Sequence, residues 1–465
     1  MKARKVVNFA LYAVAAGFLA LHLLPVGSVL ASFKPEPTTN ATLAAEAECT
    51  SGDFNVLTYG NPLKDPLYVS LNNSERLIAP VPSGVNLVNN PKALDLAADG
   101  KPRGWADDKY GQSNATFSLV RNALPNANAL RVEVRDYQAG DAKWLMDSVA
   151  VKEGQIVNVS FQYRSQQDSE VVATYIDERG ETRYVNVTQL TNTNNQWMTY
   201  RGDIVIPPGT KQLQIAQALT ANGIIESTNY SITSRPISGF QRGIVSVTFD
   251  DGWGSIYEKG LPLFDKYRIP TTQFVVANYD KGKAYMTADQ ITALQKKGHE
   301  IGSHSYSHAK LTQQNTSELH TEVAGSQAVL QDRYTGSASN FAAPFGVYND
   351  EVSQKIAQCY QSHRTTDTGY NTAGYDRYQV RVQNVEVDTT PAEVKSWVDY
   401  AQQNKLWLVL VYHQVENGGD YAVDTSALEA QLKVIADSGI HAATYNDALL
   451  ETYPQGRQLA PYSGF

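Results

Sequence analysis

Two different patterns of apolar residues follow one another along the chain. From Asn86 to about Thr233, apolar and polar residues alternate with a period of two, as in Ile156–Tyr163. Turn residues such as Glu153-Gly154 and Pro208-Gly209 separate these runs, and no strong period of 3.6 residues intervenes. A period of two is typical of strands with one buried face. The pattern predicts many short strands joined by turns, as in an all-β sandwich over residues 84–235.

After Ser238 the pattern changes to apolar strands that alternate with helices. Strands are predicted at 244–249, 272–277, 405–412 and 441–444, and helices at 255–267, 287–297 and 424–437. Thr287 and Gln290 have the spacing of a capping box, and Thr390-Pro391 with Glu393 begins another helix. Alternating strands and helices predict a parallel β/α architecture. We therefore expect one barrel-like domain over residues 240–452, smaller than a full eight-fold barrel.

The N-terminal residues have the composition of an export signal. Lys2, Arg4 and Lys5 precede an uncharged stretch that runs from Val6 to Phe33. Residues 1–31 therefore suit a cleaved signal peptide, and the stretch is also nearly long enough to remain as a membrane anchor. In either case we expect the rest of the chain to be secreted or to lie on the extracellular face of the membrane. Residues 32–83 contain many Pro and Thr residues and are interpreted as a linker or connector.

Composition excludes several classes of protein. The chain has 465 residues, 42% of them hydrophobic and 18% charged, so it can form large cores. With 39 Lys and Arg against 47 Asp and Glu, its net charge is −8, which makes nucleic acid an unlikely partner. Two cysteines exclude a four-cysteine zinc site and an iron–sulfur cluster. We expect Cys49 and Cys359 to be free thiols, although one disulfide between them stays open. The oligomeric state is not predicted.

Polar residues with catalytic chemistry follow several of the predicted strands. Asp250 and Asp251 come directly after the apolar run Ile244–Phe249. Two carboxylates that point into one pocket cannot both stay charged unless a cation or a proton separates their roles. The alternative is an ordinary Asp-Asp-Gly turn after a strand.

Histidines follow two other strands. His304 and His308 are four residues apart, and on a helical turn this spacing places both imidazoles on one face, as in other His-x3-His metal sites. Two structural histidines are the alternative. His413 leaves the fully apolar run 408–412, where it would reach the mouth of a barrel. The segment Phe341–Gly346, taken alone, is only a loop.

In combination, these segments resemble the polysaccharide deacetylase family, which is the NodB-homology domain of carbohydrate esterase family four. The segments are TFDDG at 248–252, HSYSH at 304–308, APFG at 343–346 and VYH at 411–413. The resemblance covers about residues 240–452, and the Asp-Asp-Gly and His-x3-His motifs are its most specific features. It implies an irregular (β/α) barrel of about seven strands, which agrees with the alternation of elements.

The resemblance also implies a metal-dependent removal of N-acetyl groups from the amino-sugar residues of an extracellular or cell-wall polysaccharide. Asp251, His304 and His308 would bind one divalent metal, usually Zn²⁺ in this family. Asp250 would be the general base for the attack of metal-bound water.

Three further residues receive roles from the resemblance. The backbone N–H of Phe345, with Pro344 beside it, would face the oxyanion and the substrate. His413 would be the general acid that protonates the departing amine. Many family members carry an arginine where Ala342 stands, and that arginine orients the base; Arg364 or Arg381 would supply its charge here.

Two other functions stay open. The same metal centre would serve an O-acetyl esterase or a non-sugar amidase. A glycan-binding protein whose barrel has lost activity is the other alternative, and the absence of arginine at Ala342 keeps it open.

The β-rich region carries a second resemblance. Asn86–Pro91 followed by Pro102–Trp105 is similar to the start of jelly-roll carbohydrate-binding modules. Trp105, Trp144 and Trp197 are candidates for stacking on sugar rings. Packing in the core of the sandwich is the alternative for each of them, and a purely structural role for this region stays open.

Overall fold

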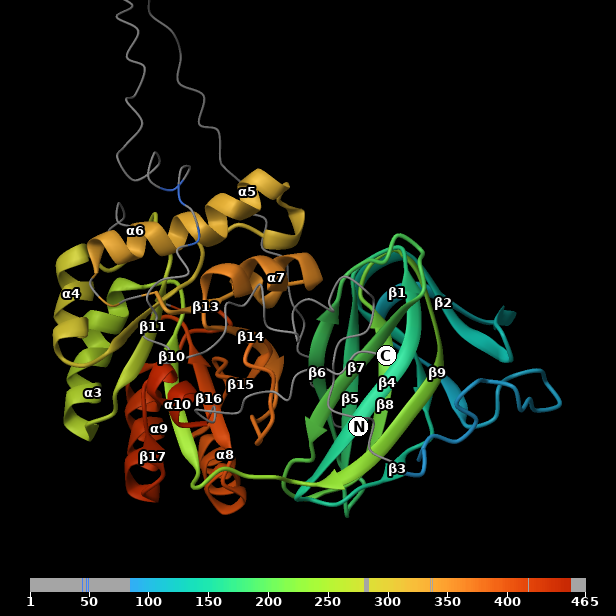
Figure 1. Ribbon diagram of the computed structural model, residues 1–465. Helices are drawn as coiled ribbons and strands as arrows, with labels where there is room; N and C mark the ends of the chain where they lie inside the picture. The colour runs from blue at the N-terminus through green and yellow to red at the C-terminus, as the bar shows by residue number, and fades with distance from the viewer. Residues whose placement is uncertain are drawn as a thin grey trace, which may run out of the picture.

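The computed structural model describes Ala44, Ala47, Cys49 and residues 84–452, apart from residues 280–283, 335, 337 and 417. Our predictions for residues 1–31, and for nearly all of 32–83, lie outside the described residues. Figure 1 shows an all-β half beside a half in which helices surround a sheet. Among the described residues, no helix has the length and the hydropathy needed to cross a bilayer.

The all-β half is a single antiparallel sheet that folds over itself into two layers. Its strands are β1 (Trp105–Leu124), β2 (Ala127–Met146), β3 (Val149–Ala150), β4 (Gln155–Ser165), β5 (Ser169–Asp177), β6 (Thr182–Leu190), β7 (Met198–Val205), β8 (Thr210–Leu219) and β9 (Gly223–Pro236). The main order is β6-β5-β8-β2-β9-β4-β7, with β1 on β2 and β3 on β8. The predicted all-β fold is confirmed.

Strand β2 joins the two layers. Its first half pairs with β9 and its second half with β8, and between them Asp136 and Gly140 have positive φ angles of 52° and 98°. These residues bend the strand, so the apolar faces of both layers meet in one core. Phe161 and Val159 of β4 share this core with Ile215 of β8. We expected a sandwich, and the structure makes it from one continuous sheet.

The C-terminal half is a closed parallel barrel. Its strands are β10 (Ile244–Phe249), β11 (Thr271–Val275), β12 (Glu300–Ser303), β13 (Asn340–Ala342), β14 (Ser362–Thr368), β15 (Val380–Asn384), β16 (Trp407–Tyr412) and β17 (His441–Ala442). Strands β10 to β16 form a ring, because β10 pairs with both β16 and β11, and β17 adds to β10. The predicted irregular barrel of about seven strands is confirmed.

Helices cover the outside of the barrel (Figure 1). They are α3 (Leu261–Tyr267), α4 (Ala288–Lys296), α5 (Thr316–His320), α6 (Ser326–Arg333), α7 (Asp350–Cys359), α8 (Pro391–Asn404), α9 (Thr425–Ser438) and α10 (Tyr445–Thr452). The predicted capping box at Thr287 with Gln290 is present, and the helix predicted to start at Thr390-Pro391 also begins with a capping box, formed by Thr390 and Glu393. Such caps satisfy backbone N–H groups that no residue inside the helix can reach.

A disulfide joins Cys49 to Cys359 at the end of α7, with 4.8 Å between the two Cα atoms. Our expectation of two free thiols is therefore wrong. Ala44 and Ala47, just before Cys49, are buried against the barrel, and the Ala47 carbonyl is hydrogen bonded to the ring of His320 in α5. The bond closes a loop of 310 residues, so no local pattern could reveal it.

Candidate metal centre and active site

The candidate site lies at the carboxyl ends of the barrel strands. Asp250 and Asp251 directly follow β10, His304 follows β12, and His413 follows β16. Parallel strands of a barrel end at one rim, and the loops after them form the active site in folds of this kind. The fold therefore brings together side chains that lie up to 163 residues apart in the sequence.

Three of the predicted residues converge on one point. Oδ1 of Asp251 lies 3.4 Å from Nε2 of His304 and 3.2 Å from Nε2 of His308. All three ligand atoms lie within 4.8 Å of one another. Ligands at about 2.0–2.2 Å from a tetrahedral ion are separated from each other by about 3.3–3.6 Å. The measured distances to Asp251 are close to this value, so the triad fits one metal ion.

Neighbouring groups orient two of these ligands. The Nδ1 atom of His304 lies 2.8 Å from the carbonyl oxygen of Ala342, which holds the proton on Nδ1 and leaves the Nε2 lone pair free. The indole N–H of Trp253 donates to Oδ2 of Asp251 at 2.9 Å, so Oδ1 faces the imidazoles. These contacts fix the carboxylate and the imidazole in orientations that suit metal binding.

The two histidines do not lie on a helical turn, the arrangement in which their spacing would place both imidazoles on one face. The segment after β12 is a loop in which Ser305 and His308 have positive φ angles of 68° and 62°. The buried carboxylate of Glu322 holds this loop by accepting hydrogen bonds from the backbone N–H groups of Tyr306 (3.1 Å) and Ser307 (2.9 Å). It also accepts a hydrogen bond from the Ser307 hydroxyl.

Our sequence reasoning missed Glu322. It lies fourteen residues beyond His308 in a helical stretch, where a glutamate is unremarkable. Its backbone carbonyl also accepts a hydrogen bond from the N–H of Tyr306. Glu322 therefore replaces the helix as the element that places both imidazoles.

Asp250 has a different partner from Asp251. The buried guanidinium of Arg364, in β14, donates from Nη2 to both carboxylate oxygens of Asp250 at 2.6 Å. In the sheet, Arg364 is the register partner of Ala342, the position at which the family resemblance expects an arginine. The small side chain of Ala342 leaves space beside this strand, and the cation comes from the neighbouring strand instead.

Arg381, the other candidate for this role, lies elsewhere. It donates to the carbonyl oxygens of Thr368 at 3.3 Å and Val187 at 3.5 Å. The carboxylate of Asp367 attracts its guanidinium. Arg381 therefore lies where the barrel meets the sandwich, and Arg364 is the arginine that contacts Asp250.

His413 completes the rim beside Asp250. Its Nε2 lies 4.0 Å from Oδ2 of Asp250, and its ring is 5.0 Å from that of Tyr421. Within the described part of the chain, the buried Nδ1 of His413 has no hydrogen-bond partner. Nε2 is therefore the atom of this imidazole that faces the other site residues.

Burial and neighbouring charges shift the pKa values of three site residues. Burial raises the pKa of Asp251, but hydrogen bonds from His304 and His308 outweigh it and hold that pKa well below its usual value. Burial lowers the pKa of His304, but the negative charges of Asp250 and Asp251 outweigh burial, so the pKa of His304 is raised above its ordinary value. At His413, burial prevails and lowers the pKa. The triad thus keeps a carboxylate charge that favours a cation.

The loop after β13 presents an aromatic ring to the site. Phe345 has a positive φ of 59°, is 47% exposed and has its ring 4.5 Å from that of His308, while Pro344 is buried. Gly346 has a φ of 65°, and a Cβ atom there would lie 1.8 Å from Oγ1 of Thr366. An exposed phenylalanine with a positive φ is rare enough to indicate a functional position.

The three candidate tryptophans of the sandwich differ in exposure. Trp105 and Trp144 are 6% and 4% exposed, and they pack against Tyr230 and Phe117 in the core. They cannot offer a face to a sugar, so the core alternative is correct for both. Trp197 is half-buried, with the guanidinium of Arg164 5.0 Å from its ring, and its role in stacking stays a prediction.

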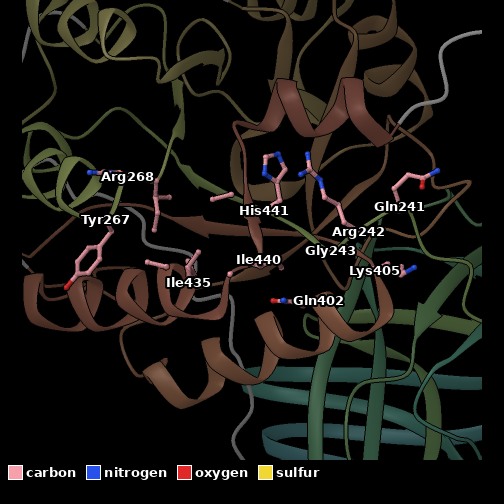
Figure 2. A pocket seen from close by; sticks show the side chains of 14 residues that line it. Gln241, Arg242, Gly243, Tyr267, Arg268, Gln402, Lys405, Ile435, Ile440 and His441 are labelled. Atoms are coloured by element: carbon pink, nitrogen blue, oxygen red, sulfur yellow. The ribbon is translucent and has the colours of Figure 1, made fainter.

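A cavity lies at the end of the barrel where β10 begins, opposite the rim that carries the site, and Figure 2 shows residues that line it. Its volume is about 610 Å³, and its lining includes Arg242, Lys405 and His441. Arg242 donates to both carboxylate oxygens of Glu451 at 2.8 Å and 2.7 Å, and His441 lies 3.6 Å from the same carboxylate. Volume alone therefore does not mark the site, because the converging ligands are at the other rim.

Comparison with known proteins agrees with this location. Residues 238–361 match the family model described as polysaccharide deacetylase. The chain is 31% identical over 135 residues to a chitin deacetylase of Arthroderma benhamiae, which covers 29% of this chain and 36% of the relative. It is 27% identical over 133 residues to the peptidoglycan-N-acetylglucosamine deacetylase PgdA of Listeria monocytogenes, which covers 28% of each chain.

The third relative is a bifunctional xylanase/deacetylase of Pseudobutyrivibrio xylanivorans, 25% identical over 114 residues, or 24% of this chain and 18% of the relative. The chain thus spans less than half the length of the curated relatives it matches. The match to the polysaccharide deacetylase family model is thus confined to residues 238–361, the segment that carries the Asp-Asp-Gly and His-x3-His motifs.

Proposed function

We propose, from this family match and the geometry of the site, that the protein is a metal-dependent hydrolase that removes N-acetyl groups from the amino-sugar residues of an extracellular or cell-wall polysaccharide. The observation that carries the proposal is the convergence of Asp251, His304 and His308 beside a second, arginine-bound carboxylate. The relatives named for chitin and for peptidoglycan N-acetylglucosamine support this class of substrate.

Asp251, His304 and His308 would hold the metal. Two imidazoles and one carboxylate suit zinc and leave coordination positions open. A metal bound there supplies a Lewis acid that polarises a carbonyl group and lowers the pKa of water. The hydrogen bonds from Trp253 and to the Ala342 carbonyl keep the ligand atoms turned toward the ion.

Asp250 would accept the proton from the attacking water. A single nitrogen of Arg364, Nη2, contacts both oxygens of Asp250 and holds the carboxylate in one orientation through charge-assisted hydrogen bonds. The arginine also offsets the cost of burying this carboxylate beside Asp251. Asp250 is therefore fixed as a proton acceptor and is not free to turn toward the metal ligands.

His413 would donate a proton to the nitrogen of the departing amine from Nε2. The new carbon–oxygen bond gives acetate, the carbon–nitrogen bond breaks, and the amino sugar leaves with a free amine. The backbone N–H of Phe345, with Pro344 beside it, would donate to the oxygen that gains negative charge. Burial lowers the pKa of His413, which favours release of its proton.

The same proposal includes the location of the enzyme. Residues 1–31 would direct export, either as a cleaved signal peptide or as a membrane tether, and the substrate would be met outside the cell. The β-sandwich would help to hold the polymer.

The test is product analysis on a panel of acetylated glycans. Acetate should appear from N-acetylglucosamine oligomers when zinc is supplied and should fall to background after chelation. Asp250→Asn should keep zinc binding and lose acetate release. Equal activity in metal-free protein would contradict the proposal, acetate from acetylated xylan alone would indicate an esterase, and glycan retention without any acetate would indicate a binding protein.

A further inference from the structure

The residue that follows the Asp-Asp-Gly motif, Trp253, contacts the carboxylate of the metal triad. Its side chain is half-buried, and its indole N–H donates to Oδ2 of Asp251 at 2.9 Å. The other oxygen, Oδ1, is the atom that lies 3.4 Å from Nε2 of His304 and 3.2 Å from Nε2 of His308. The two carboxylate oxygens therefore have different partners, and the indole keeps Oδ2 away from the imidazoles.

The backbone around Asp251 leaves the carboxylate little freedom to move. Asp251 and Gly252 have positive φ angles of 71° and 81°, and this conformation is costly for an aspartate. A neighbouring segment holds the turn, because the N–H of Met286 donates to the Gly252 carbonyl at 2.8 Å. The N–H of Gly254 donates to the Ala284 carbonyl, also at 2.8 Å. Movement of the carboxylate is thus left to its side-chain torsions.

A row of aromatic rings holds the indole in place. The ring centroid of Tyr285 lies 4.8 Å from that of Trp253, and the centroid of Tyr279 lies 4.4 Å from that of Tyr285. The ring of Tyr279 lies 6.3 Å from the imidazole of His308. Aromatic rings at separations of about 4.5–7 Å pack favourably. The row therefore connects the residue that orients Asp251 with a second ligand of the triad.

The orientation of the carboxylate decides how many ligands it supplies. With Oδ2 held by the indole, Asp251 offers one oxygen beside two imidazoles, which gives three protein ligands and one open position on a four-coordinate ion. Both oxygens would bind only if the carboxylate turned and its hydrogen bond to Trp253 broke. A carboxylate that binds through both oxygens raises the number of ligands, and it suits ions that prefer more oxygen ligands, such as Mn²⁺.

We propose that Trp253 is a positioning residue that restricts Asp251 to binding the metal through one oxygen, and that it thereby makes the site selective for a four-coordinate ion such as Zn²⁺ over Mn²⁺. The inference rests on the proposed function, because it takes the triad to be the metal site, and it deepens that function by assigning the choice of metal. Trp253 acts on the metal only through Asp251, so metal binding is the property to measure.

The experiment removes the indole N–H and keeps an aromatic ring. Trp253→Phe preserves a ring beside Tyr285 and leaves Oδ2 of Asp251 without its donor. Trp397→Phe is the matched control, because Trp397 is also half-buried against the core of the barrel and lies on α8, which supplies no ligand. In the full chain, competition with a chelator gives the dissociation constants for Zn²⁺ and Mn²⁺, and the visible spectrum of the Co²⁺-loaded protein reports the coordination number.

Trp253→Phe should lower the preference for Zn²⁺ over Mn²⁺ about tenfold. The strong visible absorption of four-coordinate Co²⁺ should weaken in this variant, and Trp397→Phe should match wild type in both measurements. A wild-type metal preference together with a wild-type Co²⁺ spectrum in Trp253→Phe would overturn the inference. If Trp253→Phe does not fold, X-ray absorption of zinc-loaded wild type decides: four nearest ligands support the inference, and six overturn it.

These measurements separate the inference from the proposed function. A wild-type protein that selects Zn²⁺ but releases no acetate would contradict the proposed function, and the comparison of variants would still decide the role of Trp253. Acetate release with an equal metal preference in wild type and Trp253→Phe would contradict the inference alone. A wild-type protein that binds no metal would overturn both.

Discussion

Two buried clusters of charged side chains, one in the sandwich and one in the barrel, can be compared directly. In the sandwich, Lys143 of β2 has a side chain only 2% exposed, and it forms ion pairs with Asp141 and with Asp108 at 3.1 Å. In the barrel, Arg364 is fully buried against Asp250. Both clusters place one cation beside two acidic side chains.

The two clusters differ in what the cation leaves unpaired. Lys143 contacts both of its aspartates, and Lys143 and Asp108 are register partners on adjacent strands, so the charges compensate within the sheet. Arg364 binds only Asp250, and Asp251 faces two imidazoles instead. In the described part of the chain, the only cluster of three or more His, Cys, Asp or Glu side chains with the geometry of a metal site is the one in the barrel. The comparison shows that a buried cluster of charged side chains indicates a metal site when one carboxylate has no cationic side chain as its partner and can bind a metal ion.

The largest expected effect is a loss of acetate release that occurs when the barrel site is changed and does not occur when the sandwich cluster is changed. His308→Ala removes a metal ligand and should lower acetate release by about 10³-fold or more, with loss of zinc binding in a titration. Asp108→Asn removes a carboxylate from the sandwich cluster and should leave the rate unchanged. Equal losses in both variants would contradict the distinction between the clusters.

The next effect tests whether the buried cation of each cluster stabilises the fold. Arg364→Met and Lys143→Met each leave a buried carboxylate without its cation, and each should lower the free energy of unfolding by about 3–5 kcal/mol in urea. Only the barrel variant should also slow acetate release, by about 10²-fold, because Asp250 loses its orientation.

A conservative variant serves if Arg364→Met does not fold. Arg364→Lys keeps the charge but replaces the rigid planar guanidinium with a flexible ammonium group, which holds the carboxylate of Asp250 less firmly. We expect it to fold, to bind zinc normally and to have a reduced kcat with an unchanged KM. A wild-type kcat would show that orientation of Asp250 is not the role of Arg364.

A smaller effect concerns the loop that carries the histidines. Glu322→Gln removes the carboxylate that holds Tyr306 and Ser307, and it should weaken zinc affinity by about 10–100-fold, as measured by competition with a chelator. Glu318→Gln is the matched control, because that glutamate caps α5 through the backbone of Asn315. Unchanged zinc affinity in Glu322→Gln would show that the loop is held by other contacts.

The smallest effect is a pH dependence in the sandwich. Burial, with repulsion from Asp141, raises the pKa of Glu170 to about 7 from an ordinary value of 4.5. The folded protein therefore binds this proton more tightly, and its stability is full below about pH 4.5 and falls as the pH rises toward 7. Because solvent screens part of the shift, the loss should be about 1–2 kcal/mol.

Glu170→Gln should remove this dependence. The measurement is the difference in unfolding free energy between wild type and variant at pH 5 and at pH 8, which cancels the titration of other groups. A difference that does not change with pH would mean that Glu170 titrates normally. The rate of acetate release, measured at one pH, should be the same in Glu170→Gln and in wild type.

Local patterns were sufficient to predict most of the fold. Alternation with period two identified the sandwich strands, and the capping boxes at Thr287 and Thr390 placed two helices within a residue or two. These features depend on neighbours in the sequence, so one sequence is enough to find them. The bend of β2 was not predicted, because Asp136 and Gly140 resemble any turn residues.

The site was predictable in its residues but not in its contacts. The motifs named both arginine candidates, and only closure of the barrel shows that Arg364 reaches Asp250 while Arg381 lies at the junction. The spacing of His304 and His308 suggested a helix, whereas backbone torsions at Ser305 and the distant Glu322 place them. Burial of Trp105 and Trp144 also depends on which face of a strand meets the second layer.

The bond between Cys49 and Cys359 determines how mechanical load would travel through the molecule. The sandwich lies between these two residues in the sequence, so a pull on the chain ahead of Cys49 would pass directly into α7 through the sulfur atoms. The nine-stranded sheet would carry none of that tension.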